Sequence, residues 1–354
     1  MRVWVGRLLR DGDVHENVLF EADDDGRVVA ETTGPRPDDA VALSFAVPGF
    51  GNAHSHAFHR ALRGRTHEGG SFWTWREVMY RAAGRLEPGA YRDLAAGVFG
   101  EMVANGWTAV GEFHYLHHRP DGTPYPDHDM ERALADAAEA AGIRLVLLDT
   151  AYLSGGVAGE PLSERQRRFS DADAAGYLDR WHRLRAELGA YAPTIALGAA
   201  LHSVRAVARD AMREIVAGLP ADVPLHIHLS EQPAENADCI AVHGLTPTGL
   251  LAADGILSRR LSVVHATHLS SEDIALLGEA RVHAVFCPST EADLGDGIGP
   301  ARELLDAGAG IALGSDQNAV VDPLLEMRGL EAGERLRSMQ RGRIEPADLW
   351  RAGS

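Results

Sequence analysis

The sequence predicts an α/β fold, a (β/α)8 TIM-type barrel preceded by a small N-terminal β-subdomain. Three observations support this prediction. From Val47 onward, short apolar runs alternate with longer segments of helical period, a pattern typical of βα units on a parallel sheet. Eight such runs are present, as a barrel of this kind requires. The length of 354 residues also suits a barrel that folds as one unit.

The first part of the chain has a different pattern, in which short β-segments are interrupted by turns rich in Asp and Gly. We therefore assign residues 1–46 to the β-subdomain and residues 47–354 to the barrel. The final segment, Gly342–Ser354, looks like the start of a helix, and no return strand follows it. The subdomain is therefore expected to be small or to be completed by C-terminal residues absent from this chain. Its expected β-segments are Val3–Val5, Val18–Glu21, Val28–Ala30 and Ala42–Phe45.

The barrel strands are expected in the short apolar runs, and helices in the segments between them. The first strand ends near His54, and the other seven are Thr108–Phe113, Arg144–Leu148, Thr194–Leu201, Leu225–Leu229, Leu261–His265, Val282–Phe286 and Ile311–Ser315. Among the expected helices are Pro88–Ala104, Met130–Ala141, Ala172–Leu188 and Pro323–Arg337.

Composition excludes several partners. The formal net charge of −17 argues against nucleic acid, which is bound by basic surfaces. No apolar stretch approaches the ~20 residues of a membrane span, so we expect no membrane partner. The N-terminus lacks the pattern of a signal peptide, and two cysteines, Cys239 and Cys287, cannot form a disulfide framework. A cytoplasmic location is therefore expected.

The sequence contains no lysine, so all the positive side-chain charge apart from histidine is arginine. Schiff-base chemistry on lysine is therefore excluded, and so is a lysine carbamate that bridges two metal ions. An anionic substrate would have to be held by arginine, which binds carboxylates with paired hydrogen bonds.

Histidine and aspartate occur where the predicted strands end. His54 and His56 are two residues apart at the end of an apolar strand, so their side chains face the same side. His228, His265 and Asp316 follow or end three further strands. Catalytic groups of such barrels lie at the C-terminal ends of the strands. Neutral imidazoles with one carboxylate suit Zn²⁺, with a coordination position left for water.

These residues resemble those of the amidohydrolase superfamily, in the branch that binds one metal ion through His-x-His, a strand-5 histidine and a strand-8 aspartate. Within that superfamily the sequence is similar to the formimidoylglutamate deiminases over essentially the whole chain. The matching motifs are His54-Ser55-His56-Ala57-Phe58, Ser71-Phe72-Trp73-Thr74-Trp75-Arg76, Glu112-Phe113-His114-Tyr115, Leu201-His202-Ser203-Val204-Arg205, His228-Leu229-Ser230-Glu231-Gln232 and Gly314-Ser315-Asp316.

The resemblance implies one divalent metal ion, with Zn²⁺ preferred and Fe²⁺ or Mn²⁺ as alternatives. We choose His228 over His226 as a ligand because Glu231 then follows at the His-x-x-Glu spacing of the family. We choose His265, which ends a strand, over His268 as the catalytic histidine. The implied ligands are His54, His56, His228 and Asp316, and the implied catalytic residues are Glu231, His265 and Asp316.

The resemblance also implies a set of substrate contacts, from which this sequence departs at one position. Many members of the family carry glutamine where this chain has His59, and both side chains can hydrogen-bond a carboxylate. Gln317-Asn318 is a second departure, since a serine and then a histidine often follow the aspartate in the family. The implied contacts are His59, Arg76, Tyr115, His202 and Arg205.

The implied reaction is the hydrolytic deimination of N-formimino-L-glutamate, a small anionic substrate, to N-formyl-L-glutamate and ammonia in histidine degradation. A divalent metal would lower the pKa of a bound water, which attacks the formimidoyl carbon. Asp316 would accept a proton, Glu231 would protonate the imino nitrogen, and His265 would orient the water. Arg76 and Arg205 would each bind one substrate carboxylate.

Two other functions compete with this one. The first is deamination of a purine, pyrimidine or related ring at the same metal site, and the second is a non-catalytic scaffold of the same fold. Histidines 114, 117 and 118 lie close together in one loop, and we expect most of them to face solvent rather than to bind a second metal. We expect a homodimer, the commonest oligomer.

Overall fold

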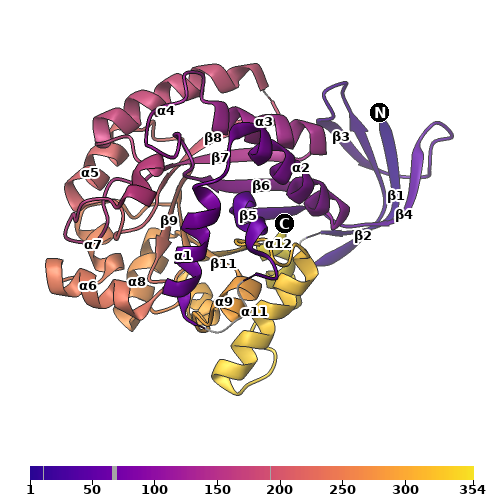
Figure 1. The fold of residues 1–354 in the computed structure, drawn as a ribbon. Coiled ribbons are helices and arrows are strands. Elements are labelled where there is room, and N and C mark those ends of the chain that lie inside the picture. Colours follow the sequence, from indigo (N-terminus) through magenta and orange to yellow (C-terminus); the bar gives the residue numbers. More distant parts are fainter. Residues whose placement is uncertain (11, 66–69, 192) are drawn as a thin grey trace.

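The computed structural model describes residues 1–354 except residues 11, 66–69 and 192. Eight parallel strands form one sheet in the order of the sequence, surrounded by helices (Figure 1). The predicted fold class is therefore confirmed. The strands are β5 (Phe50–Ser55), β6 (Trp107–His114), β7 (Arg144–Ala151), β8 (Ile195–Leu201), β9 (Leu225–Leu229), β10 (Leu261–His265), β11 (His283–Phe286) and β12 (Gly310–Leu313).

The helices follow the strands as the alternating pattern predicts. The 3₁₀ helices are η1 (Ala57–Leu62), η2 (Glu164–Phe169) and η3 (Gly189–Tyr191). The α-helices are α1 (Phe72–Ala83), α2 (Pro88–Ala104), α3 (Asp129–Ala141), α4 (Ala174–Leu188), α5 (Arg209–Gly218), α6 (Pro233–His243), α7 (Pro247–Ala253), α8 (Ser271–Ala280), α9 (Pro288–Leu294), α10 (Ala301–Ala307), α11 (Pro323–Ser338) and α12 (Pro346–Gly353). None of the helices in the described part of the chain combines the length and hydrophobicity needed to span a bilayer.

Large aromatic side chains fill the layer between the strands and the helices. Trp107 at the start of β6 and Trp181 on α4 are fully buried. Each indole N–H donates to a backbone carbonyl, that of Val321 at 2.8 Å and that of Gly198 at 2.9 Å. Buried tryptophan is stable where its one polar atom has such a partner. The Trp181 bond joins α4 to β8, and the Trp107 bond joins β6 to the segment just before α11.

The N-terminal residues form a separate mixed sheet, which stands to one side of the barrel (Figure 1, indigo). Its buried core is small and centres on Val5, Leu8 and Val18. The division into domains at residue 46 stays a prediction. The strands are β1 (Arg2–Arg10), β2 (Asp13–Ala22), β3 (Val28–Thr33) and β4 (Val41–Ala46), in the order β3-β2-β1-β4, and each is longer than the segment expected from the sequence.

The first and last barrel strands meet at a short and irregular seam. β12 ends at Leu313, before the predicted end at Ser315, and Asp316 then forms an isolated bridge with Ser55. The backbone N–H groups of Ser315 and Asp316 both donate to the carbonyl of His54 at 3.0 Å, and His56 N–H donates to the carbonyl of Asp316 at 2.9 Å. The barrel is therefore closed through the backbone of its own predicted metal ligands.

A buried asparagine stabilises this seam. The Asn318 amide donates to Ser55 Oγ at 3.1 Å, to His56 O at 3.0 Å and to Asp316 O at 3.1 Å. Its carbonyl oxygen accepts from Ser315 Oγ at 2.6 Å. Because the side chain is fully buried, water cannot replace these bonds if they are lost.

We expect the substitution Asn318→Ala to lower the free energy of unfolding by about 2–4 kcal/mol, because it leaves several buried polar groups without partners. Guanidinium-induced unfolding measures the loss. Asn105→Ala is the control, since this exposed asparagine at the end of α2 bonds only one helix carbonyl, at 2.9 Å. Equal losses for the two variants would contradict a special role for the seam.

Candidate active site

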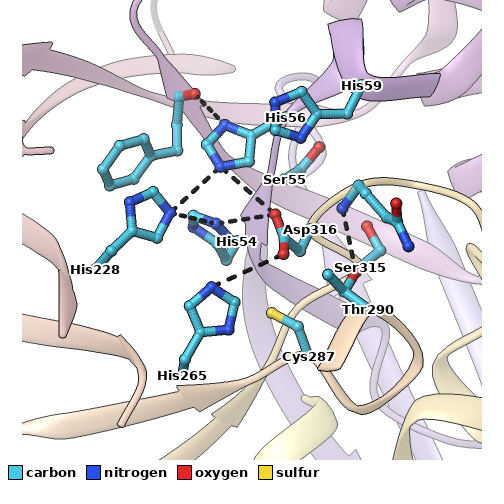
Figure 2. Close-up of polar contacts among 12 residues, drawn as sticks. His54, Ser55, His56, His59, His228, His265, Cys287, Thr290, Ser315 and Asp316 are labelled. Carbon is cyan, nitrogen blue, oxygen red and sulfur yellow. Dashed lines mark hydrogen bonds and ion pairs between the residues drawn. The ribbon is translucent and has the colours of Figure 1, made fainter. Parts of the chain in front are cut away.

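Four side chains from three strand ends meet at the carboxyl end of the barrel (Figure 2). His228 Nε2 lies 3.2 Å from His54 Nε2 and 3.3 Å from His56 Nε2. Asp316 Oδ1 lies 3.5 Å from the Nε2 atoms of both His54 and His56. Four ligands placed tetrahedrally at ~2.0–2.1 Å from one ion would lie about 3.3–3.4 Å apart. The four side chains therefore have the spacing of ligands around a single metal ion.

The hydrogen bonds of the histidines leave the correct nitrogens free for a metal. His56 Nδ1 lies 2.8 Å from the Phe113 carbonyl, and His228 Nδ1 lies 2.9 Å from the His202 carbonyl. Since a carbonyl oxygen only accepts, both Nδ1 atoms carry the proton and both Nε2 atoms present lone pairs. Burial lowers the pKa of His56 to about 3 and the pKa values of His54 and His228 well below their ordinary range. This neutral donor set fits a divalent cation.

Left-handed backbone conformations occur beside the candidate metal site. Ser230, His265 and Asp316 have φ values of 50°, 70° and 41°. Such values cost of order 1–3 kcal/mol in residues other than glycine and concentrate at functional sites. Here they occur just after β9, at the end of β10 and just after β12, where the chain turns. The register shift in β5 between Asn52 and Ser55 adds a further irregularity at His54.

His265 lies next to the metal cluster and contacts three carboxylates. Its Nε2 is 3.6 Å from Glu231 Oε1 and 3.9 Å from Asp316 Oδ2, while its Nδ1 is 3.4 Å from Glu291 Oε1. Burial lowers the pKa of His265, but the three negative charges outweigh it and raise the pKa to about 10. His265 is therefore a charged donor that faces both carboxylates that were predicted to be catalytic.

Two buried glutamates that sequence reasoning did not identify support the site. Glu291 accepts from the Cys287 N–H at 2.9 Å in addition to its contact with His265. Glu112 accepts from the Ala57 N–H at 2.6 Å, and burial raises its pKa to about 8. A signal was available for both, because Glu112 lies near the end of β6 and Glu291 shortly after β11, as the ligands do on their own strands.

All five residues predicted to bind substrate line one cavity, which the candidate ligands His56, His228 and Asp316 also line. They share it with Glu231 and His265 and with two tyrosines that sequence reasoning missed, Tyr80 and Tyr152, whose hydroxyl oxygens are 3.2 Å apart. The five are His59, Arg76, Tyr115, His202 and Arg205. Within this set, His59 Nε2 lies 3.1 Å from the hydroxyl of Tyr115.

The two arginines of the cavity differ in their partners. The Arg76 guanidinium lies 4.5 Å from the ring centre of Trp73, and within the described residues it forms no ion pair. Arg205 is already paired with two carboxylates, with its Nη2 2.9 Å from Glu231 Oε2 and its Nε 2.8 Å from Glu235 Oε2. Arg76 is therefore the arginine whose charge is available to an anionic ligand.

The neighbouring histidines that were considered as alternatives lie elsewhere. His226 is buried but lines a different cavity, together with Ser262 and His283. His268 precedes α8, and its Nε2 lies 2.8 Å from the Asp296 carbonyl. The structure thus places His228 among the four candidate ligands and His265 beside them, and leaves His226 and His268 outside the site.

The expectation that histidines 114, 117 and 118 mostly face solvent is wrong, because all three are buried. His117 Nδ1 lies 2.8 Å from Glu131 Oε1 and its Nε2 2.8 Å from the Thr150 carbonyl. Burial and Arg180 lower the pKa of His117, but the carboxylates of Asp149 and Glu131 outweigh them and raise it. Both ring nitrogens therefore donate hydrogen bonds, and His117 has no lone pair to offer a metal.

A (β/α)8 barrel with three histidines and an aspartate at its carboxyl end defines a metal-dependent hydrolase. Residues 45–352 match the model of the amidohydrolase family, and the chain belongs to that family. It is 41% identical over 334 residues to formimidoylglutamate deiminase of Pseudomonas aeruginosa, a match that covers 93% of this chain and 73% of the relative.

Solved structures agree with this assignment. An amidohydrolase from Brucella melitensis superposes with a TM-score of 0.93 at 36% identity, over 99% of this chain and 80% of the other. An adenosine deaminase from Xanthomonas campestris with bound zinc has a TM-score of 0.82 over 100% of this chain and 78% of the other. At 23% identity, the second likeness concerns the fold alone.

We expect metal-replete protein to carry about one divalent ion per chain, since the cluster is a single four-ligand site. His228→Ala should lose most of this metal, because it removes the ligand that contacts both other histidines. Elemental analysis after gel filtration measures the content. His226→Ala, on the same strand but in another cavity, is the matched control and should retain the ion. Equal metal loss in both variants would count against the ligand set.

The low pKa of His56 predicts a pH effect on the metal-free protein. Below pH 6.5 the unfolded chain protonates this imidazole, whereas the folded chain does not until about pH 3, so acid favours unfolding. Buried carboxyl groups such as Glu112 have the opposite effect on the pH dependence of stability. The effect of His56 is therefore measured as the difference between wild type and His56→Gln. Between pH 6.0 and 5.0, wild type should lose on the order of 1 kcal/mol more stability than His56→Gln.

Chemical unfolding of chelator-treated protein at the two pH values provides the measurement. The same substitution at exposed His15 on β2 is the control and should follow the wild type. Parallel pH dependence of wild type and His56→Gln would show that His56 is not held neutral by burial.

Proposed function

We propose that this chain hydrolyses N-formimino-L-glutamate to N-formyl-L-glutamate and ammonia, as a step of histidine degradation. The activity named for the Pseudomonas aeruginosa relative supports the proposal. The structural observation that carries it is the guanidinium of Arg76, which lines the same cavity as the candidate metal ligands and whose buried Nε has no hydrogen-bond partner among the described residues. A cation in that position favours an anionic substrate over an uncharged ring.

Different side chains of the site can carry out the separate steps of the reaction. A divalent metal bound here would lower the pKa of a water molecule from 15.7 towards ~7 and so supply the nucleophile. Asp316 Oδ2, which faces His265, is placed to accept the proton that the water loses. Glu231 would deliver one proton to the imino nitrogen during attack and a second as the C–N bond breaks and ammonia leaves; both protons come from the attacking water, whose oxygen becomes the formyl oxygen, and Asp316 and Glu231 would pass them on. His265 would stabilise the attacking oxygen. Addition of water and loss of ammonia together balance the conversion of the formimino group to a formyl group.

The remaining assignments are also proposals. We propose Zn²⁺ as the metal because three neutral imidazoles with one carboxylate suit it well. We propose a cytoplasmic location because Cys239 and Cys287 are both free thiols in the fold. The homodimer stays a prediction.

Ammonia release from N-formimino-L-glutamate, measured beside guanine, cytosine and adenosine, tests the activity. Arg76→Ala should raise KM about 10- to 100-fold, since hydrogen bonds to charged groups contribute about 1.5–3 kcal/mol. Arg81→Ala, exposed on the same helix, is the control and should leave KM unchanged. Glu231→Gln should lower kcat by about 10²- to 10⁴-fold, because it removes the proton donor.

The competing functions give different results. Preference for one of the ring substrates would overturn the proposed substrate and support a ring deaminase. Absence of turnover on every substrate, together with absence of stoichiometric metal, would support a non-catalytic scaffold.

A further inference from the structure

We propose that Glu235 is a positioning residue for the hydrolysis, which holds the proton donor Glu231 through two separate contacts, one with Ser230 and one with Arg205. This inference rests on the proposed function, because it takes Glu231 as the donor. Glu235 lies in the first turn of α6, immediately after the loop that follows β9, and it does not line the substrate cavity. It therefore acts through other residues.

The first contact fixes the backbone before Glu231. One carboxylate oxygen of Glu235 accepts from the N–H of Ser230 at 2.8 Å. Ser230 has a φ of 50°, a conformation that L-residues other than glycine, asparagine and aspartate rarely adopt. This turn lies between Leu229, the last residue of β9, and Glu231. The hydrogen bond to the Ser230 N–H therefore fixes the direction of the backbone between the end of β9 and Glu231.

The second contact fixes the side chain of Glu231. The other carboxylate oxygen of Glu235 lies 2.8 Å from Arg205 Nε, and Arg205 Nη2 lies 2.9 Å from Glu231 Oε2. The guanidinium of Arg205 thus forms ion pairs with both carboxylates, and of these two contacts only the one with Glu231 is aligned as a hydrogen bond. Because the two carboxylates share this cation, the charge of Glu235 bears on the position of Arg205, and through it on Glu231.

The negative charge of Glu235 indicates that this residue does more than stabilise the fold. Glu235 is fully buried, and burying a carboxylate costs several kcal/mol unless a charged partner compensates it. A neutral glutamine would satisfy the Ser230 N–H equally well, because its side-chain carbonyl accepts the same hydrogen bond. The ion pair with Arg205 is the contact that requires the charge, and that contact leads to Glu231.

The substitution Glu235→Gln separates the two contacts, since it keeps the acceptor for Ser230 and removes the ion pair. In the metal-loaded full-length chain we expect kcat to fall about 10- to 100-fold, the range for groups that position active-site residues, with KM and metal content little changed. Glu326→Gln is the matched control. Glu326 is also fully buried in the first turn of a helix, α11, and it accepts from the Ser289 N–H at 3.0 Å.

A double-mutant cycle with Glu231→Gln identifies the route of the effect. If Glu235 acts through Glu231, the second substitution should cost no further kcat once Glu231 is gone. Additive losses, or an equal loss of kcat in Glu326→Gln, would overturn the proposal and show a general effect of burial.

A crystal structure of metal-loaded Glu235→Gln gives a readout that is independent of turnover. The Glu231 carboxylate should leave its place beside His265, and an unchanged Glu231 would overturn the proposal even if activity fell. Failure of wild type to turn over N-formimino-L-glutamate would instead contradict the proposed substrate. The cycle would then be measured on whichever substrate of the panel reacts, and with no reactive substrate the crystal structure alone would decide.

Discussion

The closure of the barrel between β5 and β12 is the constraint on which the site depends. The hydrogen bonds of this seam are made by the backbones of His54, His56 and Asp316, whose side chains form three of the four candidate ligands. Anything that opens the seam therefore separates the ligands. The reverse also holds, since an ion that draws these side chains together would stabilise the closed barrel. A bound ion and the closed seam would in this sense stabilise each other.

The seam is irregular because the same residues close the barrel and carry the candidate ligands. A regular parallel pairing would alternate side chains strictly between the inside and the outside of the barrel. The register shift in β5 and the left-handed φ of Asp316 depart from that alternation and direct functional groups inward. The cost of these departures is offset by buried hydrogen bonds, chiefly those of Asn318. The barrel thus accommodates a local arrangement that ordinary strands would not adopt.

Much of the fold and of the metal cluster could be predicted because the signals are local. Apolar runs mark the strands, and a strand end separated His265 from His268, whereas the His-x-x-Glu spacing of the family separated His228 from His226. The supporting residues could not be predicted in the same way. Glu235 and Glu291 act through contacts with Arg205 and His265, which depend on how different βα units pack together.

The error about the loop histidines has the same cause. Their local sequence is polar, which suggests exposure, yet Arg180 of α4 and Glu131 of α3 pack over this loop and exclude solvent. Three carboxylates, Glu131, Asp149 and Asp171, contact Arg180, so the buried charges compensate one another. A histidine inside such a network is stable when protonated. Only the three-dimensional arrangement shows that this compensation exists.

The strands and the helices contribute different groups to the candidate site. The metal ligands, Glu231 and His265 all lie at or just after strand ends, where the sheet holds them rigidly. Arg76 instead lies on α1, a helix outside the sheet, where the aromatic rings of Trp73 and Tyr80 flank its guanidinium. A change in α1 would therefore alter the charge of the cavity without disturbing the ligands. The charge in this part of the cavity thus depends on a helix, whereas Tyr115, His202 and Arg205, which also line the cavity, follow β6 and β8.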